Sequence, residues 1–323
     1  MGVIVQKPGL LSTIQDLGRY GYQRDGIMVS GVMDTFSMKL ANILVGNEEK
    51  EAVLEVTLIG PSLTFMVDSI ISICGGNISP TINKVPVSMY KPLIVKKGET
   101  LEFGAVQYGS RSYIAFKEGI NVEKVLGSKS TCLPATFGGL DGRALLKGDV
   151  LPVQNISLHS VENLNWRLSP YFQQLLFNGE SIRFIKGLQS HLFTRESLET
   201  FEKATYVLTK DSNRMGFRFQ GTELRLSIKQ EIVTEGVAFG SVQVPSNGQP
   251  IILMADRQTT GGYPKIAQII SVDLPRLAQL KTGESITFTE VTLFEAQQLA
   301  LQQQKEFSIL KKIIIDKWRV SGF

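Results

Sequence analysis

The sequence predicts a mainly β protein, a barrel or sandwich with few helices. Glycine and proline recur roughly every 8 to 15 residues, with runs rich in Val, Ile, Phe and Tyr between them. The densest apolar runs, Ile70 to Cys74 and Ile251 to Ala255, have the length of buried strands. No window approaches the ~18 consecutive apolar residues of a transmembrane helix, so no membrane partner is expected.

One local pattern occurs three times and supports this fold class. A glycine turn is followed by a carboxylate and then by an apolar strand at Lys97–Leu101, Lys147–Leu151 and Thr282–Ile286. The first and third copies lie in the front and back parts of the chain. We therefore expect two similar barrels.

Short helices are predicted where a capping residue precedes a periodic apolar stretch. Five helices are expected. Asp34 caps one that ends at Gly46, Ser169-Pro170 starts one over Tyr171 to Phe177, and Thr194 caps one that reaches Phe201. Asp273 starts a short one that contains Leu274, Leu277 and Leu280, and the capping box of Thr292 and Glu295 starts one that continues through Leu310. The apolar run 313–315 is expected to pack on the body or on a partner. A break in the strand pattern at 163–167 divides the chain into expected domains 1–165 and 166–292, followed by a C-terminal helix and basic tail, 293–323.

Composition excludes several classes of protein. The chain has 323 residues, 43% hydrophobic and 20% charged, which fits a folded two-domain protein. The net charge is +4, but the sequence has no basic stripe with interleaved aromatic residues. Nucleic acid is therefore not an expected partner. Gln6, Lys7 and Pro8 stand where a signal peptide would have its apolar core, so a cytoplasmic location is expected.

Cysteine and histidine are too few for a disulfide framework or a zinc site. Cys74 closes an apolar run and is interpreted as a small buried hydrophobe. His159 and His191 lack the neighbours that zinc requires, so no metal is expected. A Cys-His or Ser-His mechanism is disfavoured.

The most informative candidate site is the loop Asp256–Lys265, which follows the second apolar run. Gly261 and Gly262 allow positive φ or close approach to a ligand, and free N–H groups in such a loop can bind an anion. Arg257 and Lys265 supply charge beside it. The alternative is an ordinary polar loop. The residues of this loop taken as candidates are Asp256, Arg257, Gln258, Thr259, Thr260, Gly261, Gly262, Tyr263 and Lys265.

Three further polar clusters are candidates. Gln15, Asp16 and Arg19 lie in a glycine-containing N-terminal loop; Ser30, Gly31 and Asp34 precede a helix; and Arg214, Gly216 and Arg218 share an extended segment. Helix N-termini attract anions, but the more ordinary role for Asp34 is an N-cap. Paired arginines suit carboxylate or phosphate, with a solvated strand face as the alternative. Neither nucleotide-binding glycine motif, G-x-x-x-x-G-K-[ST] nor G-x-G-x-x-G, is present.

The order of these clusters resembles one family. The stretches that carry the resemblance are 8–19, 31–34, 41–47, 54–57, 138–144, 211–216, 243–245 and 256–265. Together they are similar to the family of the 5-oxoprolinase C subunit, which includes the KipI antagonist KipA and a carboxyltransferase-type module of urea carboxylase. One departure is Leu188, where the family usually has proline.

The resemblance implies two cyclophilin-like β-barrel subdomains and an active cleft shared with a KipI-like subunit, the B subunit of the complex. In 5-oxoprolinase a LamB/YcsF-like subunit, the A subunit, joins them, and the complex uses ATP to open 5-oxo-L-proline to L-glutamate. Among the candidates that lie in these motifs, the residues predicted as catalytic from their chemistry are Asp16, Arg214, Asp256 and Lys265, and the other candidates are predicted to bind substrate or anion. The protein is expected to be inactive alone.

Two alternative functions remain open. One is a KipI-binding antagonist that regulates a sporulation histidine kinase, without catalysis. The other is a biotin-dependent carboxyltransferase subunit of urea or allophanate metabolism. Met38-Lys39 lies inside a predicted helix and lacks the sequence context of a biotin acceptor, so biotin would arrive on another chain.

Overall fold

The computed structural model describes residues 2–158, 164–177, 179, 181–227 and 232–320. Two compact units are present, and each is described by itself. The first contains residues 1–19, 30–177 and 305–323, and the second contains 20–29 and 178–304. These units differ from the expected ranges in four places: residues 166–177 and 305–323 group with the first unit, and residues 20–29 and 293–304 group with the second.

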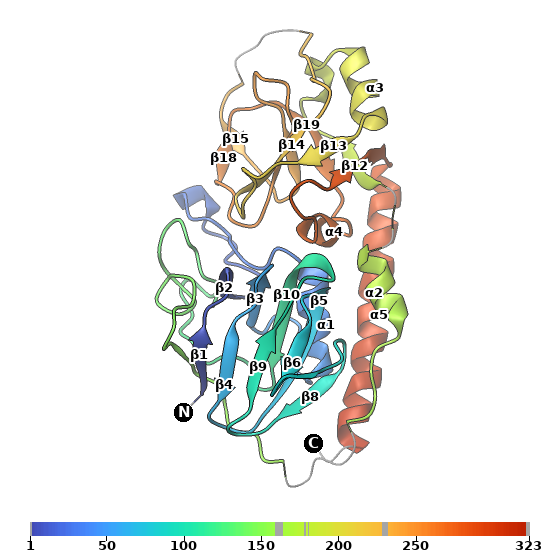
Figure 1. The fold of residues 1–323 in the computed structure, drawn as a ribbon. Helices are drawn as coiled ribbons and strands as arrows, with labels where there is room; N and C mark the ends of the chain where they lie inside the picture. Colours follow the sequence, from blue (N-terminus) through green and yellow to red (C-terminus); the bar gives the residue numbers. More distant parts are fainter. Residues whose placement is uncertain (1, 159–163, 178, 180, 228–231, 321–323) are drawn as a thin grey trace. The chain divides into compact units, whose positions relative to one another are not determined.

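The first unit contains two antiparallel sheets (Figure 1). Its six-stranded sheet has the order β11(Val150–Leu151), β1(Val3–Lys7), β4(Ser62–Phe65), β9(Thr100–Phe103), β6(Pro80–Ile82) and β7(Val85–Pro86). Its five-stranded sheet has the order β2(Leu11–Gln15), β3(Val53–Thr57), β10(Tyr108–Phe116), β5(Ser69–Asn77) and β8(Pro92–Val95).

Strand β5 contains the first predicted apolar run, and the structure confirms that it is a buried strand. Successive side chains of a strand point to opposite faces. Ile71 and Ile73 therefore join a core with side chains of the six-stranded sheet, whereas Ile70 and Cys74 join a second core on the other face. Burial raises the pKa of the Cys74 thiol well above its usual range, in agreement with a structural role.

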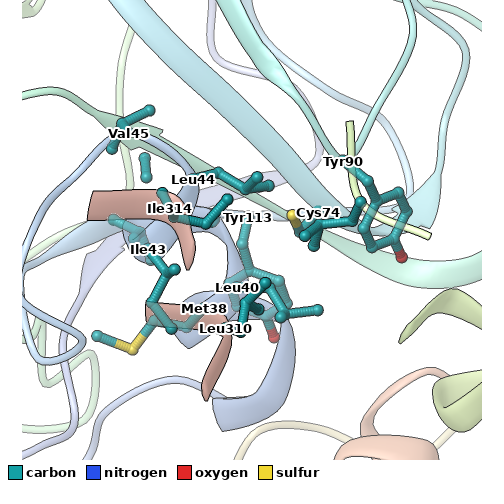
Figure 2. Packing of buried hydrophobic residues seen from close by; sticks show 14 of the residues in the cluster. Met38, Leu40, Ile43, Leu44, Val45, Cys74, Tyr90, Tyr113, Leu310 and Ile314 are labelled. Atoms are coloured by element: carbon teal, nitrogen blue, oxygen red, sulfur yellow. The ribbon is translucent and has the colours of Figure 1, made fainter. Parts of the chain in front are cut away.

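The second core of this unit lies under two helices, α1(Thr35–Leu44) and α5(Leu293–Val320). Figure 2 shows Leu310 and Ile314 of α5 beside Leu40 and Leu44 of α1. The run at 313–315 was predicted to pack on the body or on a partner. Ile314 packs on the body and is buried, whereas Ile313 and Ile315 are exposed. Helix α5 continues to Val320, so the expected basic tail is helical as far as the structure describes it.

The second unit has an eight-stranded sheet and a two-stranded ribbon. The sheet order is β20(Ser285–Ile286), β13(Tyr206–Leu208), β14(Gly216–Gln220), β17(Ile251–Leu253), β16(Ser241–Gln243), β19(Lys265–Ile269), β12(Ile182–Lys186) and β21(Phe288–Glu290), and the ribbon pairs β15(Glu235–Gly236) with β18(Thr260–Gly261). Aromatic rings fill its core, and those of Phe201 and Phe288 stack 4.3 Å apart. Strand β17 ends at Leu253, two residues before the predicted end.

All five predicted helices are present. Besides α1 and α5 they are α2(Pro170–Phe177), α3(Arg195–Lys203) and α4(Leu274–Ala278), and two 3₁₀ turns occur at η1(Gln23–Asp25) and η2(Ser190–Leu192). Thr194 caps α3 through Ser197 N, and the Thr292–Glu295 capping box forms in both directions, at 2.8 Å and 3.2 Å.

The repeated glycine turn has one geometry at its three occurrences. Gly98, Gly148 and Gly283 have φ of 91°, 93° and 89°, the left-handed region that favours glycine. The following carboxylate accepts a hydrogen bond from the backbone N–H three residues earlier, at 2.8, 2.7 and 3.0 Å respectively. Each turn leads into a strand, as the sequence predicted. The fold is mainly β, as expected.

Candidate functional site

In the first unit, the candidate carboxylate Asp16 is the centre of a buried hydrogen-bond cluster. Its Oδ1 accepts from Gly18 N at 2.8 Å, Ser128 Oγ at 2.6 Å and Ser130 Oγ at 2.5 Å. Its Oδ2 accepts from Lys129 N at 2.6 Å. Asp16 thus ties the N-terminal loop to a segment more than 110 residues away. Ser128 and Ser130 were not among the predicted site residues, although serines two apart lie on one face of an extended segment.

Gln15 and Arg19 bind the same distant segment. Gln15 Nε2 donates to Thr131 O at 3.1 Å, and Arg19 Nη2 donates to Ser130 O. The Arg19 guanidinium also lies over the Phe137 ring, 4.6 Å from its centroid. Arg19 is 1% exposed, so it supports the loop from within rather than presenting charge at a surface.

Two polar atoms of this region lack a partner among the described residues. Gln15 Oε1 and Ser30 Oγ are both buried, and neither atom forms a hydrogen bond with the described residues. Ser30 also has φ of 56°, which is uncommon for a residue other than glycine. At Gly31 an added Cβ would lie 2.9 Å from Gly18 N, so glycine is required for this close approach. Unsatisfied buried polar groups and backbone strain are frequent at functional sites.

Asp34 takes the more ordinary of its two predicted roles. It is fully buried and accepts from Ser37 N at 2.8 Å as the N-cap of α1. Its second oxygen accepts from Ser37 Oγ at 2.6 Å. The side chain therefore satisfies the N-terminal end of α1.

In the second unit, the two predicted arginines are separated by burial. Arg214 Nε lies 2.8 Å from Asp256 Oδ2, and Arg214 Nη2 lies 3.1 Å from Asp256 Oδ1, with both side chains buried. Arg218, on β14, is exposed. Gly216, between them, is buried against β17. The predicted arginine pair therefore does not form one binding group.

Lys265 is paired with a carboxylate that the sequence analysis did not select. Its Nζ, 7% exposed, forms an ion pair with Glu235 Oε1, which also accepts from Gln189 Nε2 at 2.6 Å. Hydrogen bonding from Lys265 lowers the pKa of Glu235 below its usual value. Glu235 pairs with Gly261 in the two-stranded ribbon, four residues before Lys265 in the chain. The two charged residues are 30 positions apart, so no spacing in the sequence shows that they meet.

The loop itself differs from the expected anion-binding concavity. Neither Gly261 nor Gly262 has positive φ; instead, an added Cβ on Gly261 would lie 2.6 Å from Gln243 Nε2. Gln243 Nε2 is buried and has no hydrogen-bond partner among the described residues. Arg257 is buried, donates to Met254 O at 3.3 Å, and has its pKa lowered by desolvation. The exposed or half-exposed members are Gln258, Thr259, Thr260, Gly261, Gly262 and Tyr263.

The described residues contain no group of three or more His, Cys, Asp or Glu side chains able to hold a metal ion. His191 lies in η2, and His159 lies outside the described residues. In the described part of the chain, no helix has both the length and the apolarity to cross a membrane.

Comparison with known proteins assigns the family. Residues 25–290 match the model of the carboxyltransferase domain, subdomains A and B. The chain belongs to this carboxyltransferase family. The 5-oxoprolinase C subunit of Escherichia coli K12 is 39% identical to it over 304 residues, 94% of this chain and 96% of that protein. The protein of the same name from Haemophilus influenzae is 37% identical over 306 residues.

Solved carboxyltransferase relatives have the same fold. The crystal structure of Kluyveromyces lactis urea amidolyase matches 96% of this chain with a TM-score of 0.85 and 29% identity, but the match spans only 20% of that much longer protein. The protein TTHA0988 matches 89% of this chain with a TM-score of 0.76 and 30% identity, and the match covers 55% of that protein. In both solved structures the match lies within a longer chain, whereas the E. coli protein matches over almost its whole length.

Proposed function

We propose that this carboxyltransferase-family chain is the C subunit of an ATP-dependent 5-oxoprolinase that converts 5-oxo-L-proline to L-glutamate. The observation that carries the proposal is the end-to-end match with the E. coli protein, which covers 94% of one chain and 96% of the other. The urea amidolyases match over comparable lengths of this chain, but at 31–32% identity and over only 17–18% of their own length.

The partners in this proposal are a KipI-like subunit and a LamB/YcsF-like subunit, in the cytoplasm. The active cleft would be shared with the KipI-like partner. ATP is consumed by the complex, and its binding site is not assigned to this chain, which lacks both nucleotide-binding glycine motifs.

The reaction balances with one ATP and two waters. The γ-phosphoryl group of ATP transfers to the lactam oxygen and ADP leaves. Water then adds to the lactam carbon and the C–N bond breaks, which leaves an acyl phosphate. A second water hydrolyses it to glutamate and phosphate. Negative charge develops on oxygen at each step, so preorganised cations and N–H donors would lower the barriers.

The structure supports different tasks for the residues proposed as catalytic. Lys265 is a buried cation paired with Glu235 of the β15–β18 ribbon, and it is the best candidate to contact a substrate carboxylate. Arg214 and Asp256 neutralise one another, and Asp16 is fully engaged with backbone and serine donors. We assign these three to positioning of the loops that would line the cleft.

One alternative has its own support. The family model and the urea amidolyase structures favour a biotin-dependent carboxyltransferase subunit. Met38 is fully buried inside α1, so Met38-Lys39 is no biotin attachment site, and biotin would have to arrive on another chain.

Co-expression of this chain with the KipI-like and LamB/YcsF-like proteins of the same genome tests the proposal. Release of glutamate and ADP from 5-oxoproline, dependent on all three chains, is the expected result. Lys265→Met should reduce turnover at least ~100-fold while the complex still assembles, whereas Lys147→Met, in an exposed turn, should not. Tight binding to the KipI-like protein with no turnover by the full set would overturn the proposal in favour of a binding antagonist. Carboxyl transfer to or from biotin would favour the alternative.

A further inference from the structure

A hollow of about 420 Å³ lies in the second unit, and none of its lining residues belongs to the Asp256–Lys265 loop. Its floor is formed by β14 and β17, where Arg218 stands opposite Ile251 in the strand register. Turns on either side form the walls. The charged lining residues are Asp211, Arg218 and Glu223, and Thr209 and Gln249 also line the hollow.

The walls of this hollow are fixed by local hydrogen bonds. Ser212 Oγ accepts from Arg218 N at 2.9 Å, and Thr209 N donates to Arg218 O at 2.9 Å. On the other side, the Gln249 side chain bonds both Gly221 N, at 2.8 Å, and Gly221 O, at 3.2 Å. The hollow is therefore preformed, which reduces the entropic cost of binding a ligand.

Charged groups of both signs line it and are not neutralised by each other. Within the described part of the chain, neither the Arg218 guanidinium nor the Asp211 carboxylate forms an ion pair or a side-chain hydrogen bond. Glu223 has only a distant contact, 3.8 Å, with Arg225. Thr209 Oγ1 is buried at the edge of the hollow and has no partner among the described residues.

This arrangement selects a class of ligand. A phosphate or dicarboxylate would meet the negative charges of Asp211 and Glu223, and a divalent cation would meet Arg218. A small zwitterion satisfies both signs, since a guanidinium forms a two-pronged bond with a carboxylate and a carboxylate accepts from an ammonium group. We propose that this hollow binds the α-carboxylate and α-ammonium groups of a free amino acid.

The site is independent of the proposed oxoprolinase activity. It does discriminate between substrate and product chemistry, because 5-oxoproline has its nitrogen acylated and carries no ammonium group. A free amino acid would be accepted and the lactam would not. The hollow would thus give the chain a means to respond to amino acids.

Titration calorimetry on the full chain with glycine tests the proposal, because glycine has both charges and no side chain. N-acetylglycine lacks the ammonium group, and glycine methyl ester lacks the carboxylate. Glycine should bind, and both analogues should bind at least ~10-fold more weakly, as expected for loss of a charge-assisted hydrogen bond. No glycine binding at millimolar concentration, or equal binding of N-acetylglycine, would overturn the proposal.

Variants place the binding in this hollow. Arg218→Gln and Asp211→Asn should each weaken glycine binding at least ~10-fold. Both side chains are exposed, so neither substitution should unfold the chain, and circular dichroism checks this. Lys210→Gln is the matched control, because it removes an exposed neighbouring charge that does not line the hollow. Glycine binding unchanged by both lining variants would show that it occurs elsewhere and refute the assignment.

Discussion

Arg214 and Asp256 form a buried, two-pronged ion pair that joins the segment before β14 to the start of the candidate loop. The two N–O distances are 2.8 and 3.1 Å, and Asp256 N also donates to Arg214 O at 2.8 Å. Removal of one member of a buried pair leaves the other charge without compensation. We therefore expect the pair to contribute directly to the stability of the fold and only indirectly to activity.

The first prediction concerns this pair. Arg214→Ala and Asp256→Ala should each lower the free energy of unfolding by ~3–5 kcal/mol. The double variant should lose much less than the sum, since neither member of the pair is then left buried without the other. Denaturant unfolding of the unsubstituted protein, the two single variants and the double variant measures these free energies. Arg218→Ala is the control, with an expected change within ~0.5 kcal/mol because Arg218 is exposed. Additive losses would show that the two side chains are not coupled.

The second prediction concerns Asp16. Asp16→Asn keeps the shape of the side chain but replaces one acceptor oxygen by an NH₂ donor. That NH₂ group would face the groups that now donate to Asp16, which are Gly18 N, Ser128 Oγ, Ser130 Oγ and Lys129 N. The free energy of unfolding should fall by at least ~3 kcal/mol. Asp25→Asn, on the exposed turn η1, should have an effect within ~0.5 kcal/mol. A stability of Asp16→Asn equal to that of the control would refute the structural role.

The third prediction concerns the pH dependence of the Lys265–Glu235 pair. The pKa of Glu235 is lower in the folded protein than its usual value of 4.5. The stabilisation is therefore present above about pH 4.5 and is lost as the pH falls through the folded pKa. Compared with Glu235→Gln, the natural protein should be more stable by ~1 kcal/mol at pH 7, a small value because Glu235 is partly exposed.

Thermal unfolding from pH 3 to pH 7 measures this difference. Protonated Glu235 resembles glutamine, so the two proteins should converge in acid. Glu202→Gln, an exposed substitution on α3, serves as control and should show a small difference at every pH. A Glu235→Gln difference that is constant down to pH 3 would contradict the assignment.

The fourth prediction concerns the end of α5. Trp318 is 4% exposed, donates from Nε1 to Leu44 O at 3.2 Å and meets Trp166 edge-on at 6.0 Å. Trp318→Ala should lower the stability of the first unit by ~3–5 kcal/mol. Val320→Ala, at an 88% exposed position, should change it by less than ~0.5 kcal/mol. Calorimetry of both variants compares them, and equal unfolding temperatures would mean that the helix end does not stabilise this unit.

Much of the local structure could be predicted from the sequence, because it depends on neighbours in the chain. A cap and the amide groups that it satisfies lie three residues apart, as at Asp34–Ser37 and Thr292–Glu295. The glycine turns likewise combine a backbone conformation with a carboxylate at fixed spacing. The density and length of the apolar run Ile70 to Cys74 also predicted the buried strand β5.

The sequence by itself therefore determined the mainly β class, the helix ends and, through the order of its motifs, the family. Only the tertiary structure decided which charges are neutralised, because partners such as Ser130 for Asp16 or Glu235 for Lys265 lie 30 to 114 residues apart in the chain and meet only in the folded protein. The tertiary structure also decided that Arg214 is buried whereas Arg218, four residues later, is exposed to solvent. Burial and pairing are properties of three-dimensional neighbours, so local spacing does not specify them.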